Sequence, residues 1–121
     1  MPILDQLIST HPHALHSLDP QGGVDIAEVK RICGDEITLI GNVNCGLMDT
    51  GTDEEVVASA RYALENGMRP TQGGGPTLGG VGGRYIFSTS NCVYTGMQLS
   101  RYALIQDVWR REGNYTGVEW Q

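Results

Sequence analysis

Residues that could bind a ligand or react gather at the ends of three short apolar segments. The segments are 14–18, 37–40 and 85–88, and the polar residues at or after their ends are His16, Asp19, Asn42, Asn44, Cys45, Asn91, Cys92 and Tyr94. Imidazole, carboxylate and thiol groups transfer protons, attack electrophiles or bind metals, and amides bind carboxylate or amide ligands. The pattern therefore predicts a polar site built from three separate loops.

Metal binding is one chemistry that these loops permit. If the loops fold inward, His16, Cys45 and Cys92 come close enough to share a zinc ion, at ligand distances of about 2.0–2.3 Å. No CxxC or HxxxH spacing accompanies them. The alternatives are that His16 is a hydrogen-bonded rim histidine and that both cysteines are small buried apolar residues. Asn42 and Asn44 either stabilise a turn or bind a carboxylate or amide ligand.

The middle segment indicates how such residues are positioned. Ile37–Ile40 is apolar and β-branched, which predicts a buried strand, and the stretch 41–51 after it is predicted as a loop. Thr52 and Glu55 then form a capping box for a helix from Asp53 to about Asn66. Strand, loop and helix in this order make half of a βαβ unit, whose ligands bind after the strand.

Similar units are predicted on both sides of this one. Hydrophobic spacing and turn residues predict a helix within 1–10, a strand over 14–18, a helix over 25–32 ended by Gly34, a strand over 85–88 and a helix over 98–112. The residues predicted to lie along one side of the last helix are Leu99, Tyr102, Ala103, Ile105, Gln106 and Trp109.

The Gly/Pro-rich stretch 67–83 has two interpretations. It could cradle a phosphate, but phosphate loops follow a strand and open a helix, whereas this stretch follows a helix and precedes a strand. A flexible connector is therefore the favoured interpretation. The tail, 114–121, is not assigned to an element.

Alternating strands and helices predict a parallel sheet with right-handed crossovers. The predicted fold is α/β, a single domain over 1–121 with about three βα units preceded by a helix, which is part of a (βα)8 TIM barrel. Parallel strands place all eight polar residues at the carboxyl edge, and His11, His13 and Cys33 at the opposite edge. Because three strands cannot close a barrel, both sheet edges need cover.

Composition narrows the classes of partner. The formal net charge is −6 without an offsetting basic stripe, which argues against a nucleic-acid partner. No apolar run reaches membrane-spanning length and no signal pattern is present, so a cytoplasmic location is expected. Cys33, Cys45 and Cys92 are odd in number and irregularly spaced, as expected of free thiols. A helix that begins near Met1 without a capping residue is expected of a chain cut from a longer parent.

Several motifs in combination resemble one superfamily. They are Leu15-His-Ser-Leu-Asp-Pro20, Gly23-Val-Asp-Ile-Ala-Glu-Val-Lys30, Gly34-Asp35, Leu39-Ile-Gly-Asn-Val-Asn44, Gly51-Thr-Asp-Glu-Glu-Val56 and Tyr85-Ile-Phe-Ser-Thr-Ser-Asn91. Together they resemble the C-terminal part of the uroporphyrinogen decarboxylase superfamily, which also contains corrinoid-dependent methyltransferases. The resemblance covers nearly the whole chain except the connector and the tail.

The resemblance implies a (βα)8 barrel roughly three times as long as this chain, with its site at the carboxyl ends of the strands. The roles that it implies are catalysis by His16, Asp19 and Asn91, substrate binding by Asn42, Asn44, Cys45 and Tyr94, and metal binding by Cys92. It implies zinc or a corrinoid as cofactor, and a tetrapyrrole or corrinoid as small-molecule substrate. Asn91 stands where decarboxylases have a histidine and methyltransferases a zinc-ligand cysteine, and Cys92 follows it.

Three functional hypotheses remain open. In the first, the chain is a fragment of a lyase of porphyrin biosynthesis or of a methyltransferase, inactive alone because most expected catalytic groups lie outside it. In the second, it is a non-catalytic module whose sheet is completed by self-association into a homo-oligomer. In the third, it is a small zinc protein that uses His16, Cys45 and Cys92.

Overall fold

The computed structural model describes residues 3–16, 18–33, 37–68 and 84–113. Along the chain its elements are α1 (Leu4–Ser9), β1 (Ala14–His16), the 3-10 helix η1 (Pro20–Gly22), α2 (Ile26–Cys33), β2 (Thr38–Val43), α3 (Cys45–Thr50), α4 (Asp53–Gly67), β3 (Tyr85–Thr89) and α5 (Leu99–Glu112). Gly34, the tail and 69–83 of the predicted connector lie outside the described residues. No helix of the described ranges has both the length and the apolar character needed to cross a membrane.

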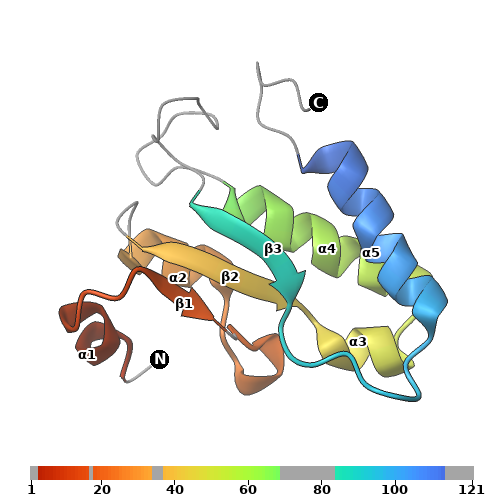
Figure 1. The fold of residues 1–121 in the computed structure, drawn as a ribbon, viewed down its shortest axis with the longest axis horizontal. Helices are drawn as coiled ribbons and strands as arrows, with labels where there is room; N and C mark the ends of the chain where they lie inside the picture. The colour runs from red at the N-terminus through yellow and green to blue at the C-terminus, as the bar shows by residue number, and fades with distance from the viewer. Residues whose placement is uncertain (1–2, 17, 34–36, 69–83, 114–121) are drawn as a thin grey trace.

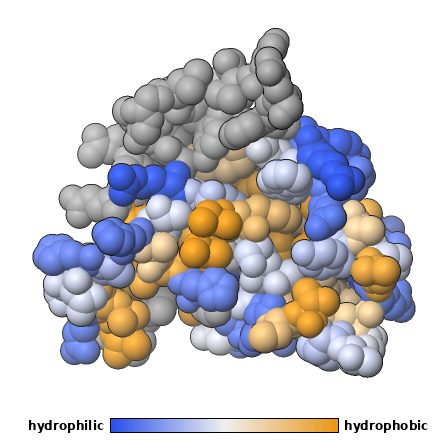
Figure 2. All heavy atoms as spheres, viewed as in Figure 1, coloured by the Kyte–Doolittle hydropathy of each residue, from blue (hydrophilic) through white to orange (hydrophobic). Residues whose placement is uncertain are grey.

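The strands form one parallel sheet, as predicted, in the order β1-β2-β3 (Figure 1). Leu15, Leu39 and Tyr85 stand side by side in its register. The helices α2 and α4 lie behind the sheet, and α5 lies beside α4. The opposite face carries exposed Ile86, and Figure 2 shows apolar residues gathered over the strands on this face. The described helices therefore cover one face of the sheet and leave the other open.

The core lies between the sheet and its helices, in two clusters. One cluster joins β2, α3, α4 and α5 through Val43, Met48, Val56, Ala60, Ala63, Leu64, Met68, Ile105 and Val108. The other joins α1, α2 and the start of β2 through Leu4, Leu18, Ile26, Val29, Cys33, Ile37 and Leu39. Burial of these side chains is the main force that holds the helices on the sheet.

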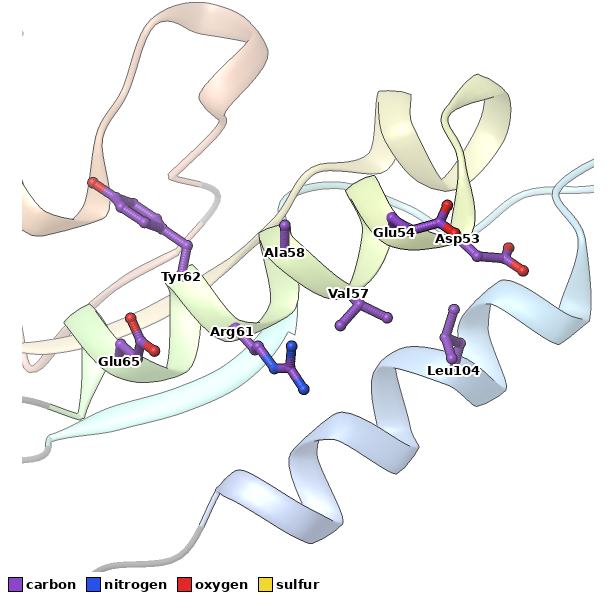
Figure 3. Close-up of a pocket in the computed structure, with 8 residues that line it drawn as sticks. All are labelled: Asp53, Glu54, Val57, Ala58, Arg61, Tyr62, Glu65 and Leu104. Atoms are coloured by element: carbon purple, nitrogen blue, oxygen red, sulfur yellow. The ribbon is translucent and has the colours of Figure 1, made fainter.

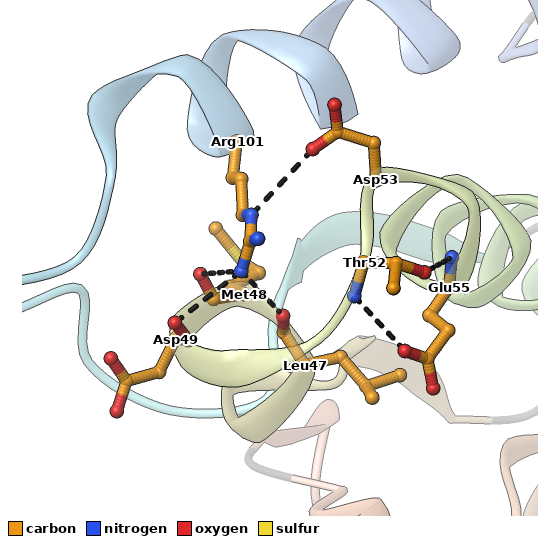
Figure 4. Close-up of polar contacts among 7 residues, drawn as sticks. All are labelled: Leu47, Met48, Asp49, Thr52, Asp53, Glu55 and Arg101. Carbon is orange, nitrogen blue, oxygen red and sulfur yellow. Dashed lines mark hydrogen bonds and ion pairs between the residues drawn. The ribbon is translucent and has the colours of Figure 1, made fainter.

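The capping box of α4 is confirmed (Figure 4). Thr52 Oγ1 accepts a hydrogen bond from Glu55 N at 3.2 Å, and Glu55 Oε1 accepts one from Thr52 N at 2.9 Å. Together they satisfy two backbone donors that would otherwise lack partners at the helix start. The helix ends at Gly67, within one residue of its predicted end, and Met68, which belongs to the predicted connector, is buried.

Two strands differ from their predicted ranges. β1 ends at His16 rather than at Leu18, whose side chain instead enters the core. β2 continues through Gly41 to Val43, where a loop was predicted. Gly41 has φ +143°, a conformation that L side chains rarely adopt, so the strand continues through a position that requires glycine.

The predicted loop also contains a helix, α3, that sequence reasoning missed. Asn44 caps it, with Oδ1 accepting hydrogen bonds from Gly46 N at 2.9 Å and Leu47 N at 3.3 Å. At its other end, Arg101 of α5 points its guanidinium at the last carbonyls of α3 (Figure 4). Arg101 Nε lies 3.6 Å from Asp53 Oδ1, which is an ion-pair distance but too long for a hydrogen bond. A short helix is thus fixed at both ends by side chains.

Three of the residues predicted to share one side of α5 are exposed. Leu99 is 79% exposed, Trp109 is 47% exposed and Ala103 is exposed. The buried residues of α5 are Ile105, which belongs to the predicted side, and Val108, which does not. Packing on α4 determines which side of α5 is buried, because Ile105 and Val108 both belong to the cluster that α5 shares with α4.

Candidate functional site

Six of the eight predicted site residues line two hollows. The first, named the thiol hollow, measures about 360 Å³ and is lined by Gln21, Cys45, Gly46, Asp49, Thr50, Asn91, Cys92 and Tyr94. The second, named the amide hollow, measures about 200 Å³ and is lined by Pro20, Val24, Asp25, Asn42, Asn44, Ser59 and Tyr62. The loops that follow β2 and β3 therefore meet, as their parallel direction predicts, but they divide their polar groups between two sites.

The thiol hollow joins the start of α3 to the loop after β3. The Cys45 sulfur accepts a hydrogen bond from Asn91 N at 3.2 Å and donates to Asn91 O at 3.3 Å. Cys45 N donates to Ser90 Oγ at 3.3 Å, and both of these residues are buried. Cys45 thus links two loops, whereas Cys92 is exposed in the same hollow.

A tyrosine–carboxylate pair forms another part of the wall of the thiol hollow. Tyr94 OH donates a hydrogen bond to Asp49 Oδ2 at 2.7 Å. This bond and the negative charge of Asp49 favour the neutral phenol, so the pKa of Tyr94 is raised above its ordinary value. The pair joins α3 to the loop after β3 and leaves the second carboxylate oxygen of Asp49 available to a ligand.

Asn42 is the deepest polar group of the amide hollow. Its side chain is only 5% exposed, because it lies on β2 beneath α4 and the η1 turn. Its side-chain amide lines the hollow and is not sealed from solvent without a partner, since within the described residues the buried side-chain atom that lacks one is Arg101 Nε. Its neighbour Asn44, by contrast, uses its side chain to cap α3, and its N–H donates to Ser59 Oγ at 2.9 Å.

A second tyrosine–carboxylate pair borders the amide hollow. Tyr62 OH of α4 donates to Asp25 Oδ1 at 2.6 Å, and the same oxygen accepts from Ala27 N at 3.0 Å. The hydrogen bond to Asp25 raises the pKa of Tyr62, with smaller contributions from burial and from the charge of Asp25. Asp25 therefore caps α2 and also joins it to α4 at the edge of the hollow.

The remaining predicted residues lie outside both hollows. His16 is exposed at the end of β1, and Asp19 accepts a hydrogen bond from Gln21 N in the η1 turn. Across the described ranges, no three His, Cys, Asp or Glu side chains form a group that could hold a metal ion. The structure therefore does not bring His16, Cys45 and Cys92 together as a zinc site. Cys33 is in the core, where burial raises the pKa of its thiol and Lys30 opposes that rise.

Sequence reasoning missed several residues of the two hollows. Gln21 and Asp49 of the thiol hollow lie in a predicted turn and a predicted loop, and neither carries a local signal for function. Ser59 and Tyr62 of the amide hollow are three residues apart on α4, so they share a helix face. That spacing is a signal, but it becomes informative only once α4 is known to pass over Asn42.

Two further hollows contain none of the predicted site residues. One, of about 560 Å³, opens between α4 and α5, where Val57 and Leu104 point toward each other and Arg61 lies beside them (Figure 3). The other, of about 480 Å³, lies along the outer edge of β3 against Tyr102, Ile105 and Trp109 of α5. Both are bordered by helix surfaces rather than by the loops at the carboxyl edge.

Comparison of the chain with known proteins finds no relative. No protein-family model matches the chain, and no curated protein or solved structure shows significant similarity to it.

Proposed function

We propose that this chain is a segment of a barrel related to uroporphyrinogen decarboxylases and corrinoid-dependent methyltransferases, and that its thiol hollow is part of a corrinoid-binding rim. The observation that carries the proposal is the meeting of Cys45, Asn91, Cys92 and Tyr94 in one hollow after the carboxyl ends of two adjacent parallel strands. Barrel enzymes bind their ligands at this end of the strands.

The one-sided cover of the sheet supports the barrel. In a (βα)8 barrel, the helices lie outside the parallel strands and the opposite face of the sheet turns inward. Here α2 and α4 lie on one face, and Ile86 on the other face is 53% exposed (Figure 1). An apolar side chain on the open face is suited to the packed interior of a barrel.

The position of α5 supports a further strand next to β3. Each helix of a barrel packs between its own strand and the next one. The hollow beside β3 is bordered by Tyr102, Ile105 and Trp109, so apolar side chains of α5 face the position where that strand would lie. The exposure of Trp109 is then explained by a neighbour that the described residues do not supply.

Charge favours a corrinoid over uroporphyrinogen. Within the described part of the chain, no lysine or arginine lines the thiol hollow, Asp49 contributes a negative charge, and the chain carries −6 overall. Eight carboxylates of uroporphyrinogen would be repelled there, whereas the amide side chains of a corrinoid can pair with Gln21 and Asn91. A hollow of about 360 Å³ holds an edge of such a ring, as expected for one part of a larger rim.

Binding of cobalamin tests the proposal. We expect weak, saturable binding of hydroxocobalamin, measured by its visible absorption spectrum, and loss of most binding in Asn91→Ala and Gln21→Ala. The matched control is His13→Ala, an exposed residue at the opposite end of β1, which should bind as the unmodified chain does. Absence of binding, or equal binding by all variants, would overturn the proposal.

Catalytic assays separate binding from turnover. We expect the isolated chain to turn over neither uroporphyrinogen nor a methylated corrinoid, because most of the family's catalytic groups are not in its sequence. Appreciable turnover of either substrate would show that the expected dependence on the rest of a barrel is wrong.

A second candidate, a module completed by self-association, is favoured by the outer edge of β3, which no strand of the described residues covers. Ser90 N bonds to Val43 O, and Leu39 N bonds to Arg84 O, so the even-numbered residues of β3 pair with β2. In a parallel ladder, the residues between these paired ones point their backbone N–H and C=O groups away from the partner strand. In β3 these are the odd-numbered residues, which include Phe87 and Thr89. Such an edge pairs readily with another strand. The solution mass of the chain tests this second candidate. A dimer or larger assembly is expected, and a stable monomer would contradict self-association.

A further inference from the structure

We infer that Cys45 and Cys92 form a thiol–disulfide exchange site that reacts with small disulfides. Cys92 is the exposed thiol of the pair, Cys45 is the buried one, and both line the thiol hollow. The product is an intramolecular disulfide between the start of α3 and the loop after β3. The inference needs no corrinoid, so it can hold or fail independently of the proposed corrinoid rim.

The main chain around Cys92 lies against the sulfur of Cys45. That sulfur is 3.2 Å from Asn91 N, 3.3 Å from Asn91 O and 3.9 Å from the carbonyl oxygen of Cys92. A carbonyl oxygen lies about 2.4 Å from the Cα of its own residue, so the Cα of Cys92 is within about 6.3 Å of the Cys45 sulfur. The two residues are therefore neighbours in space although 47 positions separate them in the chain.

The loop that carries Cys92 can complete the approach of the two sulfurs. Residues 91–96 are all exposed, so a shift of this loop does not disturb the two core clusters. The exposed side chain of Cys92 can also change its rotamer rapidly. A disulfide requires Cα atoms about 4.4–6.8 Å apart, which such an adjustment can provide.

The reaction consists of two exchanges. Cys92 loses its proton to solvent and its sulfur attacks one sulfur of the small disulfide, whose S–S bond breaks and releases one half as a thiolate. Cys92 then holds the other half as a mixed disulfide. Cys45 loses its proton and attacks the Cys92 sulfur, and the second half leaves as a thiolate. Both departing thiolates take up protons, so the chain is oxidised by two electrons and the small disulfide is reduced to two thiols.

Exposure determines the role of each cysteine. A small disulfide reaches the exposed Cys92 from solvent, whereas Cys45 is only 5% exposed and meets the mixed disulfide from within the chain. Cys33 takes no part, because it lies in the other core cluster. Burial also raises the pKa of the Cys33 thiol, which lowers its thiolate fraction.

The experiment treats the reduced full chain with oxidised glutathione. After quenching with acid, the remaining thiols are alkylated and the chain is analysed by mass spectrometry. We expect the loss of two hydrogens, no retained glutathione, one alkylated thiol at Cys33 and a bond between the peptides that contain Cys45 and Cys92. A chain that retains glutathione on Cys92, or that is linked through Cys92 to a second chain, would overturn the inference.

Variants separate the two exchanges. Cys45→Ser should accumulate glutathione on Cys92, because the thiol that releases it is absent. Cys92→Ser should take up glutathione at least about tenfold more slowly than the unmodified chain, because its remaining thiols are buried. Cys33→Ala is the matched control and should form the same disulfide at the unmodified rate. Release of glutathione from Cys45→Ser as fast as from the unmodified chain would overturn the inference.

A measurement on the unmodified chain keeps the test independent of variant folding. In buffers of reduced and oxidised glutathione, the ratio of the Cys45–Cys92 disulfide to the dithiol gives the effective concentration of one thiol at the other. This value should be at least about tenfold higher in the folded chain than in urea, because the fold holds the two residues together. The oxidised chain should then have a higher Tm than the reduced chain. Equal effective concentrations in both states would overturn the inference.

Discussion

At the scale of single residues, Asn44 shows that the side-chain oxygen of a residue predicted to bind substrate can serve the fold instead. Its Oδ1 accepts from Gly46 N and Leu47 N, and its own N–H donates to Ser59 Oγ. The neighbouring Asn42 has the same side chain but lines the amide hollow from β2. Two asparagines with the same predicted role therefore have different places in the fold, because only Asn44 precedes a helix.

The cap predicts how Asn44 responds to substitution. Asn44→Ala should destabilise the chain by about 1 kcal/mol, because two N–H groups at the start of α3 lose their acceptor. Asn44→Asp, which retains an acceptor oxygen, should cost little. Chemical denaturation measures both, and similar losses for the two variants would show that the cap is not what Asn44 contributes.

The two tyrosine–carboxylate pairs predict how stability changes with pH. The pKa values of Tyr62 and Tyr94 are raised, mainly by their hydrogen bonds to Asp25 and Asp49. A pKa raised by folding means that the neutral phenol favours the folded state. This contribution is fully present below the ordinary tyrosine value of 10.0 and is lost as pH rises through the folded-state values.

The measurement is a titration of phenolate absorbance together with unfolding at alkaline pH. Asp49→Asn should move one tyrosine titration to lower pH, toward 10.0, and should reduce the loss of stability above that pH. Asp107→Asn is the control, because Asp107 pairs with Arg111 on the surface rather than with a tyrosine. Identical titrations of Asp49→Asn and the unmodified chain would contradict the prediction.

At the scale of elements, local signals predicted α4 and not α3. The capping box and the spacing of Val56 and Ala60 are contained within α4, so the sequence alone predicts that helix. α3 has six residues, and its far end is held by Arg101, more than fifty residues later in the chain. A helix stabilised by so distant a side chain carries little signal in its own sequence.

The end of α4 provides a test of packing between elements. A Cβ at Gly67 would lie only 2.4–2.6 Å from ring atoms of Tyr85 on β3, and the hydroxyl of that ring donates to Gly41 O on β2. Gly67→Ala should therefore displace Tyr85 and weaken its bond to β2. Overpacking costs about 1–3 kcal/mol of stability, and the higher helix propensity of alanine offsets up to about 1 kcal/mol of it. A net loss of about 1–2 kcal/mol is therefore expected.

The matched control for Gly67→Ala is Gly22→Ala. No heavy atom lies within 4 Å of a Cβ placed at Gly22, and its φ is not positive. Its free energy of unfolding should change by less than about 0.5 kcal/mol. If Gly67→Ala proved equally harmless, Tyr85 would not be the restraint that requires a glycine there.

At the scale of the whole molecule, the alternation of strands and helices predicted the parallel sheet, and with it the edge where polar residues meet. It did not predict their division between two hollows, because that depends on how α3 and α4 lie over β2. The buried face of α5 could not be predicted for a related reason. Leu99 and Trp109 lie on the predicted side of α5, but the sheet of the described residues ends at β3 and leaves both largely exposed.

The outer edge of β3, which is the edge of the sheet in the described ranges, gives a prediction for the assembly of the molecule. Thr89→Pro removes an N–H that points outward, so the bonds between β2 and β3 remain and the chain should still fold. Ser88→Pro removes an N–H that pairs with β2 and should cost about 1–3 kcal/mol of stability. If copies of the chain associate through this edge, Thr89→Pro should reduce the solution mass to that of a monomer. Its loss of stability should be smaller than that of Ser88→Pro, because it removes the exposed hydrogen bond from Thr89 Oγ1 to Asn91 O but no bond to β2. An assembly that persists in Thr89→Pro would have to use the open face around Ile86 instead, because that face is unchanged by the substitution.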